Sequence, residues 1–355
     1  MKNLISLILT FGFFIFLISC SKPEVVENLD KEFSFDLNSQ IPYPSIKVEN
    51  KEIGGKTGTI EMLVFSNMDA LKLTLEELER QMEELDDAFL DFYSDLDGEE
   101  LRTKEEQINY RQEIPLFEFG NFFAYHSLFK KIDDDEKVWL ANEELDETND
   151  PDNHFIPERS TRAILNERSE VQVGNQVFKM NEFGYYIIDA NNLSALNQID
   201  EANSFEETLL VPGVIFIGDP PDQGGSSNPA DTICTGWFTK KADPHTVGDY
   251  RIKYKNYIRT YPWARYVGAK TINYKKGFLG VWYRTRSECY ARVKGFISGA
   301  DGNCQTQVNF NPNNNVAFEA RARSVKHRIN VSTRTKKIWL KSDHYGVTAT
   351  VRSIN

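Results

Sequence analysis

Cysteine and histidine are scarce in this chain of 355 residues, which contains four cysteines and five histidines. It has no Cys-x-x-Cys pair and no His-Glu-x-x-His run, so it offers neither a thioredoxin-like redox motif nor a familiar zinc site. We therefore expect no cofactor and no resident metal, and we assign no catalytic residue. Scattered histidines and carboxylates can still come together in the folded protein. We therefore keep a hydrolase as one functional hypothesis, ranked third after the two that are given below.

Long hydrophobic runs are absent except at the start of the chain. Lys2 precedes an apolar run over 4–18, which is shorter than the ~20 residues of a membrane span and typical of a signal peptide. Leu17-Ile18-Ser19-Cys20 resembles the lipobox of bacterial lipoproteins, in which the cysteine is acylated. We predict a signal peptide over 1–19, lipidation at Cys20 and a polar tether over 20–45. The lipid anchor holds the protein on a membrane.

The residue after Cys20 is Ser21 and not aspartate, so retention in the inner membrane is not indicated. We expect an outer-membrane lipoprotein, and exposure at the cell surface is a further expectation. Three cysteines follow Cys20: Cys234, Cys289 and Cys304. An oxidising compartment allows one disulfide among them, and the sequence does not select the pair.

The first part of the chain has few cations, and the last part has few carboxylates. Residues 1–231 contain 18 Lys and Arg against 47 Asp and Glu, a net charge of −29. Residues 232–355 contain 23 Lys and Arg against 6 Asp and Glu, a net charge of +17. Such an asymmetry indicates that the basic part meets either an external polyanion or the acidic part of its own chain. Nucleic acid is not expected outside the inner membrane.

The change of charge coincides with a linker rich in Pro, Gly and Ser, over 214–231. The roughly 335 residues after the signal peptide exceed what one core usually supports. We predict an α+β region over 46–213 with a long helix and a β-hairpin at Gly174-Asn175, followed by an all-β, β-sandwich-like domain over 232–355. These are called the acidic region and the basic β region below.

The long helix is predicted from an apolar seam in which spacings of four and three alternate. Ser66-x-x-Asp69 resembles a capping box at its start. The seam indicates either a helix laid on a core or a homodimeric coiled coil. We favour the core, because the flanking positions lack matched Glu and Lys pairs. The seam consists of Leu71, Leu75, Leu78, Met82, Leu85, Phe89, Phe92 and Leu96.

Cations alternate with apolar residues along the basic β region, for example over 250–259. This pattern predicts a half-buried strand with a basic outer face. Like charges on neighbouring strands destabilise a sheet by ~0.2–1 kcal/mol per pair. We therefore expect a negatively charged partner to bind this face.

Three aromatic side chains and a cation also gather within the six residues 261–266. Such rings stack on sugars, although they are equally ordinary in a sandwich core. The candidate ligand-binding residues are Tyr261, Trp263, Arg265, Tyr266, Arg251, Lys253, Lys255, Arg284 and Arg286. The first hypothesis is that they bind an anionic or neutral glycan. The second is an interaction protein, in which the basic β region docks on the chain's own acidic region or on another envelope protein.

The order of these parts resembles a group of uncharacterised lipoproteins from Bacteroidetes, over residues 1–190 and more loosely beyond. The resemblance implies surface display, and it implies no activity or site residue, because none is known for the group. It is carried by the lipobox at Cys20, Met62-Leu-Val-Phe65, Asp150-Pro-Asp-Asn-His-Phe155, Ala163-Ile-Leu-Asn166 and Glu170-Val-Gln-Val-Gly-Asn-Gln-Val-Phe-Lys179.

Overall fold

The structure is a computed structural model. It describes residues 33, 46–52, 59–96, 98–142, 144–218, 237–277, 280–299, 306–310, 315–320, 322–328, 335–349 and 351–354. The predicted signal peptide, Cys20, nearly all of the tether and most of the linker lie outside these residues. Cys234 and Cys304 also lie outside them, whereas Cys289 is buried.

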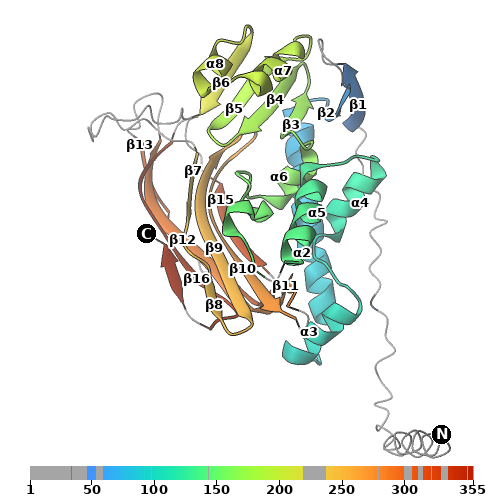
Figure 1. Cartoon of the computed structure of the whole chain (residues 1–355), viewed down its shortest axis with the longest axis vertical. Coiled ribbons are helices and arrows are strands. Elements are labelled where there is room, and N and C mark those ends of the chain that lie inside the picture. Colours follow the sequence, from blue (N-terminus) through green and yellow to red (C-terminus); the bar gives the residue numbers. More distant parts are fainter. Residues whose placement is uncertain are drawn as a thin grey trace, which may run out of the picture. The chain divides into compact units, whose positions relative to one another are not determined.

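A six-stranded sheet organises the acidic region, with its strands in chain order from one edge to the other (Figure 1). Neighbouring strands run antiparallel, except for β2 and β3, which run parallel. The strands are β1 (Ile46–Glu52), β2 (Thr59–Phe65), β3 (Glu170–Val173), β4 (Gln176–Asn181), β5 (Gly184–Asp189) and β6 (Val214–Gly218).

The helices of this region fall into two groups along the chain. Those between β2 and β3 are α2 (Met68–Phe92), α3 (Gly98–Gln107), α4 (Ile114–Phe122), α5 (Leu128–Leu140), the 3-10 turns η1 (Glu147–Asn149) and η2 (Pro151–Asn153), and α6 (Arg159–Ile164). Those between β5 and β6 are α7 (Ser194–Glu201) and α8 (Phe205–Leu209). Residues 144–153, which carry η1 and η2, are called the acidic loop.

Helix α2 buries most of the predicted apolar seam in the core, whereas Phe92 is 37% exposed and Leu96 lies beyond the end of the helix. Leu71, Leu78 and Phe89 have no exposed surface, and Leu71 and Leu78 pack with strand and helix residues of the acidic region. The interpretation as a core helix is therefore confirmed. The predicted start is wrong by one residue, since the N-cap is Asn67, whose Oδ1 accepts a hydrogen bond from the Ala70 N–H at 2.9 Å. Ser66 precedes this position and cannot cap the same N–H.

The predicted hairpin is present as β3 and β4. Val173 pairs with Gln176 across the turn, and Gly174 adopts a φ of +59°, which glycine reaches without strain. Two segments of alternating apolar and polar residues, joined by a glycine turn, were sufficient to locate this hairpin from the sequence.

The described part of the basic β region consists of strands in two sheets (Figure 1). One sheet has the order β11-β10-β9-β7, with β15 added to β10 and β8 added to β9. Its strands are β7 (Phe238–Lys241), β8 (His245–Val247), β9 (Tyr250–Thr260), β10 (Arg265–Lys276), β11 (Trp282–Arg284) and β15 (Ala322–Arg328).

The other sheet has the order β13-β12-β16-β17, with β14 added to β12. Its strands are β12 (Ser287–Gly299), β13 (Thr306–Phe310), β14 (Asn315–Ala320), β16 (Thr335–Tyr345) and β17 (Arg352–Ile354). The two sheets face one another, because the Asn256 side chain on β9 donates to Ser342 on β16 at 3.2 Å. The fold class, an α+β region followed by a sandwich-like β region, is confirmed.

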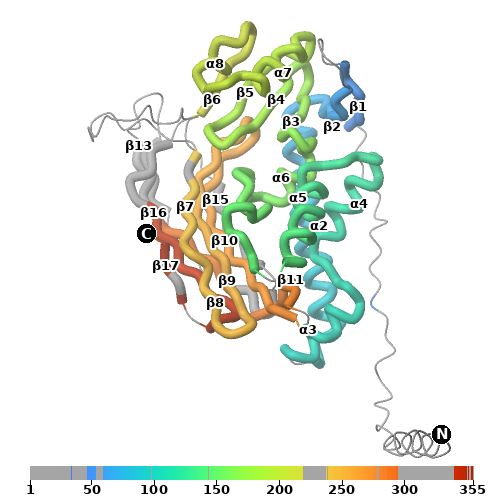
Figure 2. The backbone as a smooth tube through the Cα atoms, viewed as in Figure 1, coloured from blue at the N-terminus to red at the C-terminus, as the bar shows by residue number. Residues whose placement is uncertain are grey.

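Strand β9 is buried on both faces, which corrects the prediction of an exposed basic face. Ile252, Tyr254 and Asn256 face the second sheet, where they meet residues of β16 and β17. Lys253 and Lys255 lie on the opposite face, and each is less than a tenth exposed. Figure 2 shows the green segment that carries the acidic loop beside β9 and β10. The acidic region covers the basic face, so alternation of charged and apolar residues did not mean contact with water.

The described residues from Ile46 to Ile354 belong to one compact unit. The boundary between two domains at 214–231 stays a prediction. No helix of the described residues has the length and apolar character needed to cross a bilayer.

Candidate functional site

The candidate site is a charged interface between the acidic region and strands β9, β10 and β11, with the two residues that follow β11. It begins at Arg286, whose side chain is 2% exposed. The Arg286 guanidinium lies 2.5 Å from Asp86 of α2 and 2.9 Å from Glu105 of α3. It also lies over the Phe89 ring, 5.0 Å from the centroid. Burial alone would lower the pKa of Arg286, but the two carboxylates raise it, so the arginine stays charged.

Arg284 forms the second group of this interface. Its guanidinium donates to Glu136 of α5 at 2.6 Å and to Glu113 at 3.3 Å. The Tyr274 hydroxyl of β10 donates to the same Glu136 at 3.1 Å. These contacts join α5 to β10 and β11, and the Trp139 ring packs edge-on against Tyr274 beside them.

The acidic loop supplies the third group. Its short turns are capped by its own aspartates: Asp146 accepts from the Thr148 N–H at 2.9 Å, and Asp150 accepts from the Asp152 N–H at 3.0 Å. This local geometry presents carboxylates in succession along the face of β9. Glu147 pairs with Arg251, and Asp150 pairs with Lys253.

Asp152 lies at the centre of the third group and faces three cations. It is 2.8 Å from Lys270, 3.1 Å from Arg162 and 3.4 Å from Lys255, and all four residues are buried. Burial would raise the pKa of Asp152, but the surrounding cations hold it well below its usual range. Burial lowers the pKa of Lys255 to about 8 and lowers that of Lys270 as well. One carboxylate therefore serves more positive charge than it can neutralise.

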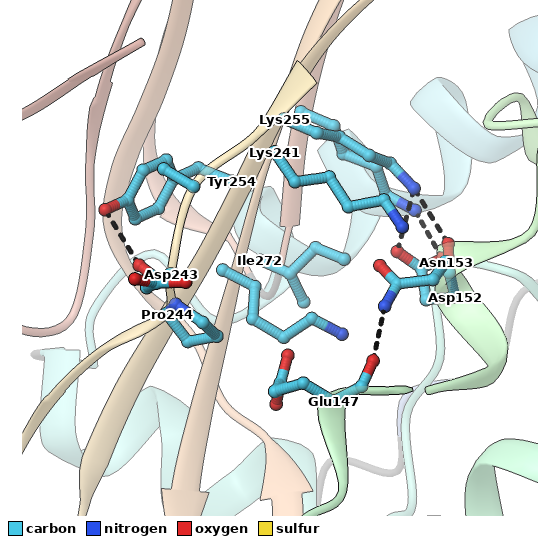
Figure 3. A pocket seen from close by; sticks show the side chains of 12 residues that line it. Glu147, Asp152, Asn153, Lys241, Asp243, Pro244, Tyr254, Lys255 and Ile272 are labelled. Atoms are coloured by element: carbon cyan, nitrogen blue, oxygen red, sulfur yellow. Dashed lines mark hydrogen bonds and ion pairs between the residues drawn. The ribbon is translucent and has the colours of Figure 1, made fainter. Parts of the chain in front are cut away.

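A cavity of about 250 Å³ lies between the acidic loop and strands β7, β9 and β10. In Figure 3, Lys241 and Lys255 extend from their strands toward the acidic loop, where Asp152 and Asn153 lie. Tyr254 closes another side and donates to the main-chain carbonyl of Asp243 at 3.1 Å. The cavity thus combines buried lysines, carboxylates and one aromatic wall. Its lining consists of Glu147, Asp152, Asn153, Lys241, Ala242, Asp243, Pro244, Lys253, Tyr254, Lys255, Lys270 and Ile272.

The aromatic segment predicted for sugar stacking lies in the interior. Tyr261 and Trp263 are 2% and 3% exposed and stack on each other, with 5.2 Å between ring centroids. Both belong to the core cluster that contains residues of α2, and the Tyr261 hydroxyl donates to Glu158. Arg265 and Tyr266 are half-buried. A sugar could reach the Trp263 ring only if the two regions separated.

The structure therefore divides the nine candidate residues among three places. Lys253 and Lys255 line the cavity, while Arg251 pairs with the acidic loop beside it. Arg284 and Arg286 lie in the other two groups of the interface. The segment 261–266 packs on the core of the acidic region.

The carboxylates of the interface were not singled out from the sequence. Asp150 and Asp152 appeared there only within a motif of the resemblance. The signal that pointed to them was the opposite net charge of the two halves, which does not identify single residues. Among the described residues, no group of three or more histidines, cysteines and carboxylates is arranged to hold a metal ion.

Comparison with known proteins gives one similar structure. No family model matches the chain, and no curated protein matches it. The chain is similar to the crystal structure of a DUF4848 family protein from Bacteroides thetaiotaomicron, with 10% identity over 81% of this chain and 93% of that one. The TM-score is 0.19, too low to indicate a shared fold.

Proposed function

We propose that this protein is a lipid-anchored outer-membrane protein whose basic β region works docked on the acidic region of its own chain. The observation that carries the proposal is the match of charge across the interface. Cations of β9, β10 and β11, together with Arg286 just after β11, meet carboxylates of α2, α3, α5, the acidic loop and Glu113 at the start of α4 in ion pairs. The proposed activity is that of an interaction protein, which presents the two regions to the envelope as one body.

Apolar contacts support the same arrangement. Trp237, Tyr261 and Trp263 share a buried cluster with core residues of the acidic region. Ile272, Tyr274 and Trp282 pack against Leu140 and Leu145. Ion pairs alone weaken in salt, whereas buried apolar area is stabilised by the hydrophobic effect at any ionic strength. We therefore expect a durable association and not a transient electrostatic contact.

This arrangement bears on the glycan hypothesis. An external polyanion would compete with Glu147, Asp150 and Asp152 for the same cations. Displacing these carboxylates leaves buried charges without partners, at a cost of several kcal/mol. The self-docked protein is therefore favoured over a glycan-binding platform built on the face of β9.

The docking is tested by cutting the linker in the folded protein. A specific protease site is placed within 223–228, the purified chain is cleaved, and its size is measured by gel filtration at low and high salt. We expect the two pieces to elute together, and Arg286→Glu to release them more readily than Lys131→Glu. Lys131 is a matched control, because it is 42% exposed and, within the described part of the chain, pairs with Asp135 of its own helix. Separation of the unmodified pieces at low salt would contradict the proposal.

The anchor is tested at Cys20. Cys20→Ser removes the thiol that an acyl transferase modifies, so we expect the protein to lose incorporated fatty acid and to leave the membrane fraction. Fatty-acid labelling and fractionation of cells measure both. If the variant stays acylated and membrane-bound like the parent, the lipobox interpretation is wrong.

A further inference from the structure

The cavity beside the acidic loop has a surplus of positive charge. Lys241, Lys253, Lys255 and Lys270 line it, opposite the carboxylates of Glu147, Asp152 and Asp243. Two of the neighbouring carboxylates already have cations of their own, since Glu147 pairs with Arg251 and Asp150 pairs with Lys253. Among the described residues, Asp152 is the carboxylate in ion-pair contact with Lys255, Lys270 and Arg162, while Asp243 lies on the side of the cavity where Tyr254 contacts its main chain.

This surplus lies in the interior of the protein. The exposed fractions of the side chains are 7% for Lys255, 1% for Lys270 and 2% for Arg162. Buried ions without enough counter-charge destabilise the folded protein, so the site is short of a negative group. At the rim, Lys241 is exposed, and among the described residues no ion pair or side-chain hydrogen bond involves its ammonium.

We propose that this cavity binds a small oxyanion, a carboxylate or phosphate group, whose oxygens accept hydrogen bonds from Lys255, Lys270 and Lys241. Oxyanions take such charge-assisted bonds at lysine ammonium groups. The volume of about 250 Å³ lies below the ~300–1,000 Å³ of pockets for drug-sized ligands, so the ligand or its bound end is small. Pro244, Tyr254 and Ile272 give it an apolar wall. The lining comes from both regions, so the proposal rests on the packing of the basic β region against the acidic loop that the proposed function describes.

Loss of a proton from a lysine is another way to remove the surplus. Burial lowers the pKa of Lys255 to about 8, and it lowers that of Lys270. A site that neutralises itself in this way has no need of an anion. The two possibilities differ in one measurable property, which is whether added oxyanions stabilise the protein.

The experiment uses the purified full-length mature protein at constant ionic strength. Its melting temperature is measured while sodium chloride is replaced by sodium phosphate, acetate or glucuronate. We expect a saturable rise with at least one of the three, because a ligand that binds only the folded state stabilises it. A stronger effect of phosphate identifies a phosphate-bearing ligand, and a stronger effect of glucuronate identifies a carboxylate on a sugar. No rise with any of the three would overturn the proposal.

Variants show whether the effect belongs to this cavity. Lys241→Met changes an exposed residue at the rim and leaves the buried charges intact. Lys255→Met removes one of the buried cations. In both we expect the concentration of half-maximal stabilisation to rise about tenfold or more, since each loses a hydrogen bond to a charged group. Lys240→Met is the matched control, because it neighbours Lys241 on β7 but does not line the cavity. If the concentration of half-maximal stabilisation rose equally in all three variants, the anions would be responding to the net charge of the protein and not to this cavity. That result would overturn the proposal.

Discussion

At the scale of single residues, the molecule depends on charged side chains that are buried in pairs. Arg286 illustrates this. Its side chain is 2% exposed and forms ion pairs with Asp86 and Glu105, which lie on two helices far from Arg286 in the sequence. Glu105 is equally buried at 2%. Such pairs add little compared with an apolar core, but breaking one leaves a buried charge without a partner. We infer that matching each buried cation to its own carboxylate favours one way of docking.

The first prediction concerns Arg286→Met, which keeps much of the side-chain volume and removes the charge. Because Asp86 and Glu105 lose their cation, we expect the free energy of unfolding to fall by about 3–5 kcal/mol. Urea unfolding measures it. Arg80→Met is the control, since Arg80 pairs with Glu77 and Glu84 on the surface of α2 and its loss should lower the free energy of unfolding far less. Equal costs for the two variants would contradict the assignment of a buried pair.

The sequence predicted the cations of this interface but not their partners. Arg251, Lys253 and Lys255 stand out because they alternate with apolar residues along one strand. Their partners lie more than 100 positions earlier in a region crowded with carboxylates, where no local pattern distinguishes Asp152 from its neighbours. The cavity was also beyond prediction, because its lining comes from four separate segments of the chain.

At the scale of elements, local signals succeeded wherever one segment determines its own structure. The seam of α2 and the glycine turn of β3 and β4 are such cases. Strand β9 was misjudged because alternation predicts two unlike faces and does not reveal what covers each. Its basic face is covered by the acidic loop, which the strand pattern cannot show.

The second prediction concerns the start of α2. Asn67→Ala removes the hydrogen bond to the Ala70 N–H, so we expect a loss of about 1 kcal/mol in the free energy of unfolding. Ser66→Ala should change it by less than about 0.5 kcal/mol, because Ser66 is exposed and precedes the cap. Chemical unfolding of the two variants decides between the two caps. A larger loss for Ser66→Ala would restore the capping box predicted from the sequence.

At the scale of the whole molecule, buried histidines link stability to acidity. His344 lies between the two sheets of the basic β region, with its ring nitrogens hydrogen bonded to Thr271 at 2.8 Å and Ser342 at 2.7 Å. Burial lowers its pKa to about 3. His154, beside the acidic loop, has a pKa of about 3 because of burial and the nearby Arg162. Both are neutral in the folded protein at pH values where the unfolded chain binds protons.

The third prediction follows from this difference. The unfolded chain binds more protons below about pH 6.5, so the free energy of unfolding should fall as the pH drops from 6.5 toward 4. Each histidine contributes up to about 1.4 kcal/mol per pH unit. Unfolding curves at several pH values should show a flatter dependence for His344→Gln than for the parent. The exposed His126 serves as the control, and a slope unchanged by His344→Gln would refute the assignment.

The parallel pairing of β2 with β3 has a consequence for how the chain reaches its native state. Val64 lies opposite Gln172, 108 positions later, and the Arg286–Asp86 pair spans 200 positions. Closing such long loops delays folding, because their entropy is lost before the contacts form. The N-terminal two thirds of the chain also leave the ribosome first, while their carboxylates still repel one another. We therefore expect this part to stay expanded until the basic strands arrive, so that the last residues to be delivered complete the structure of the first.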